Sequence, residues 1–119
     1  MSLTVTTHHH INCNELILKG SPLSDLDFEP LISKVDELLD QKELNVVINL
    51  ENIKLLNSLG IKSLIKVFTK CRNHGGDLYI VNISEKINQV LLLTKLNTVL
   101  NIAPSLNEAI NQFAKENES

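Results

Sequence analysis

The sequence predicts an α/β fold in which four helices pack on a mixed β-sheet of four to five strands. Four segments repeat apolar residues with helical spacing, and they alternate with short apolar runs rich in branched residues. The run 46–50 is almost continuously apolar, as in a parallel strand covered by helices on both faces. About 32 residues separate its start from the start of the run 78–83, which is the length of a strand–helix–strand unit.

The strands are predicted from short, branched or alternating runs of residues. The first two would form an antiparallel pair, and the later ones would be parallel and joined by right-handed helical crossovers. In chain order, we expect strands at residues 3–7, 15–19, 46–50, 78–83 and 99–102.

The four helices are predicted from their apolar stripes and their end signals. The first carries its stripe over residues 28–39 and ends near Gln41. The second carries its stripe over residues 61–71 and stops at residues 74–76, where a glycine can take the left-handed conformation that closes a helix. The third covers residues 85–96, and the last follows Pro104.

Composition limits the protein class. The chain has 119 residues, of which 43% are hydrophobic, so we expect a single domain over residues 1–119 with an aliphatic core. A net charge of −3 and 3% aromatic residues disfavour binding to nucleic acid. Cys13 and Cys71 form no CxxC motif and suggest free thiols in a reducing compartment. No apolar segment approaches the ~20 residues of a membrane span, so we expect a cytoplasmic protein without membrane contact.

Known catalytic motifs are missing from the sequence. It contains no dinucleotide-binding or phosphate-binding glycine loop, no HExxH and no GxSxG, so we expect neither an enzyme nor a cofactor. The histidines at 8–10 are the most conspicuous polar cluster. On a strand only His8 and His10 would share a face, and Cys13 would have to fold back to join them as a metal ligand. Edge or loop histidines without a special role are the favoured interpretation.

Charge is uneven along the chain. Residues 25–51 carry eight acidic and two basic side chains, whereas residues 54–95 carry seven basic and two acidic ones. Lys62, Lys66 and Lys70 recur every four residues on the second helix, away from its apolar stripe. A solvated helix face is the simpler explanation, and a docking surface for an acidic partner is the alternative.

The loop before the second helix is the favoured functional site. Ser58 lies where a helix N-cap belongs, and its hydroxyl would accept a hydrogen bond from the backbone N–H of Gly60 or Ile61. In a parallel sheet this loop lies at the carboxyl ends of the strands, where ligands and partners bind. Because Gly60 has no side chain, the backbone beside the hydroxyl would be uncovered, and another protein could approach it closely. On local pattern alone, an ordinary helix cap remains the favoured interpretation.

A family resemblance favours the functional site over the ordinary helix cap. From residue 46 to residue 113 the chain resembles the STAS domain of bacterial anti-sigma factor antagonists, whose hallmark is an apolar strand, a loop and Asp-Ser-x-Gly-(Leu/Ile) opening a helix. Here the motif is Asn57-Ser58-Leu59-Gly60-Ile61. Segments 75–82, 90–96 and 104–109 also resemble the closing segments of that family in order and spacing.

The resemblance implies a phosphorylation switch that works by protein binding. The partner would be an anti-sigma factor with serine kinase activity, which phosphorylates Ser58, and a metal-dependent serine phosphatase would remove the phosphate. Only the unphosphorylated protein would hold the anti-sigma factor and so free the sigma factor. The expected partner-binding residues are Asn57, Ser58, Leu59, Gly60 and Lys62.

The motif departs from the family pattern at two positions. Asn57 stands where phosphorylated members usually have Asp, which removes a charge beside the site and bears on recognition by a kinase. Leu59 stands where small polar residues are common and would add an exposed apolar contact. Leu92 or Leu93 would do likewise, unless their helix is buried on two sides.

Two other functions compete with the switch. One is a scaffold subunit of a larger signalling or transport assembly, in which Ser58 would only cap its helix. The other is a small hydrolase or transferase with Ser58 as nucleophile, but the motif loop offers no base except Glu51.

Overall fold

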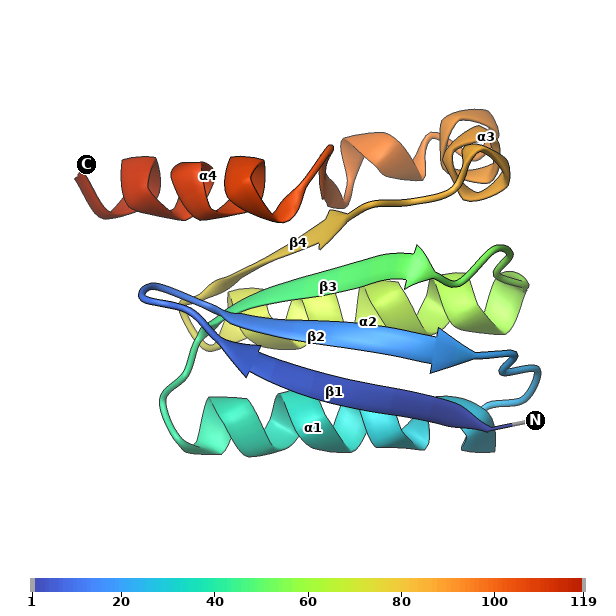
Figure 1. The fold of residues 1–119 in the computed structure, drawn as a ribbon, viewed down its shortest axis with the longest axis horizontal. Coiled ribbons are helices and arrows are strands. Elements are labelled where there is room, and N and C mark those ends of the chain that lie inside the picture. Colours follow the sequence, from blue (N-terminus) through green and yellow to red (C-terminus); the bar gives the residue numbers. More distant parts are fainter. Residues whose placement is uncertain (1, 119) are drawn as a thin grey trace.

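A five-stranded sheet with four α-helices makes up the computed structural model, which describes the backbone of residues 2–118 and side chains up to residue 116 (Figure 1). The two ends of the predicted domain, Met1 and Ser119, lie outside the described residues. In chain order the elements are β1 (Leu3–His9), β2 (Asn14–Gly20), η1 (Leu26–Phe28), α1 (Glu29–Asp40), β3 (Asn45–Asn52), α2 (Ser58–Asn73), β4 (Asp77–Val81), α3 (Glu85–Leu93), η2 (Leu96–Thr98), β5 (Asn101–Ala103) and α4 (Leu106–Glu118).

The strands lie side by side in the same order as in the sequence. β1 and β2 form an antiparallel hairpin, and each later strand is parallel to the one before it. The predicted fold class, a mixed sheet of four to five strands with four helices, is therefore confirmed. Since β2 to β5 are parallel, their carboxyl ends meet at one edge of the sheet, and the loop that leads from β3 into α2 begins there.

Helices cover both faces of the sheet. α1 and α2 pack on one face, whereas α4 crosses the opposite face over β3, β4 and β5 (Figure 1). The larger core lies under α1 and α2, and fully buried Phe28, Ile48 and Leu64 contribute to it. A smaller core lies under α4, where the rings of Tyr79 and Phe113 meet edge to face with centroids 5.0 Å apart.

Several predicted boundaries differ from the structure; β1 and β3, for example, each continue two residues beyond the predicted end. α3 ends at Leu93, three residues early, because Lys95 takes a left-handed conformation, which a helix cannot continue through. β4 ends two residues early, because Asn82 also turns left-handed, at φ 57°. β5 begins at Asn101, two residues later than expected, because the N–H groups of Val99 and Leu100 still bond to the Leu96 carbonyl of η2. No helix within residues 2–118 combines the length and apolar character that a membrane span needs.

Candidate functional site

Ser58 is the first residue of α2 and lies at the surface. Its hydroxyl has no hydrogen-bond partner among the described residues. The loop that presents it is anchored by two side chains, Ile53 and Leu56, which are 2% and 7% exposed and pack into the larger core. The serine is therefore held in place by its buried neighbours while its own side chain stays accessible.

The helix cap is Asn57, and the prediction that Ser58 caps α2 is wrong. The Asn57 carboxamide oxygen accepts a hydrogen bond from the N–H of Gly60 at 2.9 Å. Its amide nitrogen donates to the carbonyl of Leu23 at 3.0 Å and so ties the β2–η1 loop to the helix. An aspartate at this position could accept the first bond but could not donate the second, because a carboxylate carries no N–H. With the cap made by Asn57, Ser58 has no capping role.

Gly60 is buried rather than bare to an approaching partner, which corrects its predicted role as a contact residue. A Cβ atom placed on Gly60 would lie 2.9 Å from Leu56 Cδ2 and 3.0 Å from Phe28 Cζ. The glycine therefore lets the first turn of α2 pack closely on the larger core. Its contribution to the site is indirect, through the position of the helix.

The two remaining predicted contact residues differ in exposure. Leu59 is half-buried and packs against the larger core, so it offers less apolar surface than expected. Lys62 lies one turn after Ser58 and is exposed. The first turn of α2 contains no acidic residue. Positive charge therefore dominates this end of the helix, through its dipole and through Lys62.

A groove of about 510 Å³ opens beside Asn57. Of the residues that line this groove, Pro22 is buried, whereas Leu23 and Leu55 are each 62% exposed. Leu26, in η1, is 78% exposed. Exposed large apolar side chains gathered beside a groove are typical of a protein-binding surface. The residues that line the groove are Gly20, Ser21, Pro22, Leu23, Asn52, Lys54, Leu55 and Asn57.

A carboxylate of η1, that of Asp27, holds the loop that contributes Leu23 to this groove. The backbone N–H groups of Leu23 and Ser24 both donate to Asp27, at 2.9 and 3.1 Å. These two bonds favour the charged form and hold the pKa of Asp27 below its ordinary value. Asp27 thereby fixes the β2–η1 loop that presents Leu23 to solvent.

Comparison with known sequences decides the family. The sequence model of the STAS domain matches residues 11–109. This chain belongs to the STAS domain family. The match begins at the β1–β2 turn and ends inside α4, so it includes β2 to β5 and the start of α2.

Several relatives of this STAS domain carry regulatory names. A protein of Thermotoga maritima, named as a candidate anti-sigma factor antagonist, is 22% identical over 81 residues, or 68% of this chain and 72% of its own length. An anti-sigma factor antagonist from Mycobacterium paratuberculosis has a TM-score of 0.78 at 19% identity, with 95% of each chain covered. The Bacillus cell fate determinant SpoIIAA, in its phosphorylated form, has a TM-score of 0.65 at 15% identity, covering 92% of this chain and 98% of that one.

The three lysines spaced along α2 of the STAS domain, Lys62, Lys66 and Lys70, differ in their contacts. Lys70 pairs with Asp36 of α1 at 2.9 Å, so that lysine joins α1 to α2. Lys62 and Lys66 are exposed and make no ion pair among the described residues. They line a second hollow with Asp25, Glu29, Ile32 and Ser63.

Exposed apolar side chains also occur away from α2. Leu92 and Leu93 at the end of α3 are 52% and 85% exposed, so the alternative of a helix buried on two sides is wrong for these residues. The same helix buries Ile87 and Leu91 in the larger core.

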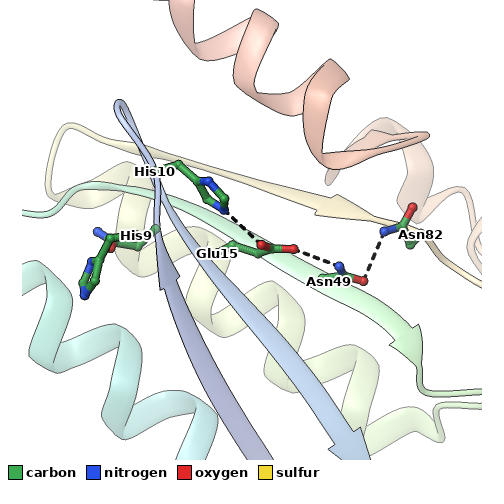
Figure 2. Close-up of polar contacts among 6 residues, drawn as sticks. His9, His10, Glu15, Asn49 and Asn82 are labelled. Carbon is green, nitrogen blue, oxygen red and sulfur yellow. Dashed lines mark hydrogen bonds and ion pairs between the residues drawn. The ribbon is translucent and has the colours of Figure 1, made fainter.

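His10 takes part in a polar network on the α4 face of the sheet, whereas His9 lies on the other side of the hairpin (Figure 2). His10 Nε2 lies 3.0 Å from the Glu15 carboxylate, and Glu15 accepts a hydrogen bond of 2.9 Å from the Asn49 amide. Asn49 in turn accepts from Asn82 at 3.2 Å. His9 bonds with Asn14 on the other strand of the hairpin. Within the described part of the chain, no three of these or other potential ligands come together as a metal site.

Both cysteines are free and buried. Burial raises the pKa of Cys13 to about 11 and that of Cys71 to about 12. At neutral pH each therefore stays a protonated thiol, which is a poor nucleophile and a poor metal ligand.

Sequence reasoning missed the groove and the polar network. The groove joins residues 20–23 to residues 52–57, and no local pattern links segments so far apart. The network left a faint signal, because Glu15 and Asn49 each interrupt an otherwise apolar strand. Buried polar residues of this kind usually have hydrogen-bond partners, which the sequence could not identify.

Proposed function

We propose that this STAS domain is an anti-sigma factor antagonist that binds its partner through the exposed start of α2 and is switched by phosphorylation of Ser58. The observation that carries the proposal is the position of Ser58, exposed at the open end of a helix and free of any capping role. A side chain that has no structural role can be modified without destabilising the fold. The names of the relatives support the same function.

Phosphate would be tolerated at this position. A phosphoserine carries about −1.5 to −2 charges at neutral pH. The N–H group of Gly60 is taken by Asn57, but those of Ser58 and Leu59 lie at the helix end, where no intrahelical acceptor is available. With no acidic residue in the first turn, the added charge meets a favourable dipole and no local repulsion within the turn.

The same charge would disfavour a protein interface. Binding through Ser58 and the neighbouring groove would bury the serine beside the apolar side chains of Leu23 and Leu55. A buried, unpaired charge costs several kcal/mol, which lowers affinity about a thousandfold. The partner would be an anti-sigma factor with serine kinase activity, and a metal-dependent serine phosphatase would restore the binding form. The protein itself would act in the cytoplasm, without catalysis or cofactor.

The alternative functions have less support. A scaffold subunit was expected to use Ser58 as its helix cap, yet Asn57 forms the cap. A nucleophilic serine needs a base within hydrogen-bond reach, and among the described residues the Ser58 hydroxyl has no hydrogen-bond partner.

Affinity capture from the protein's own cells tests the proposal. Three baits would be compared, namely the unmodified protein, Ser58→Ala and Ser58→Asp. We expect the unmodified and alanine forms to retain an anti-sigma factor, and the aspartate form to lose it. Mass spectrometry would identify the partner and detect phosphate on Ser58. Equal retention by all three baits would favour the scaffold function instead.

A further inference from the structure

Ser58 and Lys62 lie four residues apart on α2, and both are exposed. Residues at this spacing are neighbours on a helix surface, with Cβ atoms about 5–6 Å apart. Side chains of a helix lean toward its N-terminus, so a lysine at position 62 can reach back toward residue 58. The length of a lysine side chain is enough to bring its ammonium group to a phosphate carried by Ser58.

Lys62 is also available for such a contact. It makes no ion pair among the described residues, whereas Lys70, two turns further along the same stripe, is held by Asp36 at 2.9 Å. The charged groups around Lys62 are Asp25 and Glu29 on the facing segment and Lys66 on its own helix. Neither carboxylate is within ion-pair distance of Lys62. A phosphate on Ser58 would present a stronger acceptor, since it carries three oxygens and up to two negative charges.

The geometry points to Lys62 as the residue that receives the phosphate of Ser58. This inference rests on the proposed phosphorylation of Ser58 and adds a second part to the switch. In the unmodified protein, the Lys62 ammonium is free to pair with a carboxylate of the partner. After phosphorylation it is occupied by the phosphate of its own chain. The modification therefore adds negative charge and at the same time withdraws a positive docking group.

A titration of the phosphate tests the contact without a kinase or a partner. Phosphoserine would be inserted at position 58 of the full chain during translation, and the second pKa of the phosphate would be followed by ³¹P NMR. A nearby cation favours the dianion and lowers this pKa. We expect Lys62→Gln to raise the phosphate pKa by about 0.5 unit, a threefold change in the proton dissociation constant.

Lys66→Gln is the matched control. It removes the same charge from the same helix face, one turn further from Ser58, and leaves Lys54 of the preceding loop, Asp25 and Glu29 in place. We expect it to move the phosphate pKa by less than about 0.1 unit, since an exposed charge at that distance is largely screened. Equal shifts in the two variants, or no shift in Lys62→Gln, would overturn the role of Lys62.

The outcome is separable from that of the proposed function. If Lys62→Gln shifts the phosphate pKa but the phosphoserine protein still holds the anti-sigma factor, the contact exists and the switch fails. If the pKa is unmoved while phosphorylation abolishes binding, the switch stands without Lys62.

Discussion

At the scale of single residues, the start of α2 combines a structural residue, Asn57, with the proposed phosphorylation site, Ser58. Asn57 performs the capping and ties the β2–η1 loop to the helix, while Ser58 next to it is exposed. Because Asn57 makes the cap, the proposed phosphorylation of Ser58 would leave the capping hydrogen bond to Gly60 in place.

This division predicts unequal effects of two alanine substitutions. Asn57→Ala removes the cap and the bond to the Leu23 carbonyl, so we expect it to lower the free energy of unfolding by about 1–2 kcal/mol. Ser58→Ala removes an exposed hydroxyl and should change it by less than about 0.5 kcal/mol. Urea unfolding measures both. A larger loss for Ser58→Ala would return the capping role to the serine.

The two buried thiols give a prediction that depends on pH. With the pKa of Cys13 near 11 and that of Cys71 near 12, thiolate is scarce at pH 8, so a disulfide reagent should label the native protein slowly and the urea-unfolded protein at once. Because unfolded thiols ionise near pH ~8.5, the folded state should lose stability as the pH rises from that value toward 12. Rapid native labelling of both cysteines at pH 8 would contradict their burial.

At the scale of elements, the polar network joins three parts of the sheet. Glu15 of β2 lies between His10 of the hairpin turn and Asn49 of β3, and Asn49 continues to Asn82 after β4 (Figure 2). Glu15 and Asn49 are each only 4% exposed. A buried carboxylate with satisfied partners fixes the hairpin in register against the parallel strands, whereas its removal leaves those partners unpaired.

Glu15→Ala should therefore be costly. We expect a loss of about 2–4 kcal/mol in the free energy of unfolding, since the amide of Asn49 would be left buried without its acceptor. Glu51→Ala in β3 is the matched control, because Glu51 is exposed and its loss should cost less than about 0.5 kcal/mol. Chemical denaturation checks both variants, and similar values for the two would show that the network contributes little.

The elements were largely predictable because apolar periodicity is a local property. The stripes of α1, α2 and α4 and the runs of β3 and β4 each identified the correct type of element. The ends of the helices and strands depend on the conformations of single residues, which apolar periodicity does not encode. The left-handed residues Lys95 and Asn82 each shortened an element in this way.

At the scale of the whole molecule, the candidate binding surface joins segments that are distant in the sequence and that rest on the buried core. The loop of Ser58 was predictable, because a helix start after a parallel strand lies at the binding edge of the sheet. The groove was not, since it depends on how residues 20–23 lie against residues 52–57. Leu23 and Leu55 became candidate contacts only when the fold placed them beside Asn57.

The same base explains why phosphorylation should leave the fold unchanged. The loop and the first turn of α2 are anchored by Ile53, Leu56 and Gly60, and all three residues are buried. We therefore expect the phosphate to act at the interface with the partner rather than within the sheet.

Calorimetric titration of the captured anti-sigma factor into the unmodified and the phosphoserine-58 proteins tests this claim most directly. We predict a dissociation constant about a thousandfold higher for the phosphorylated form, since a buried dianion costs several kcal/mol. Amide spectra of the two forms should differ only around the start of α2. Equal affinities, or weaker binding together with spectral changes throughout the sheet, would contradict the account.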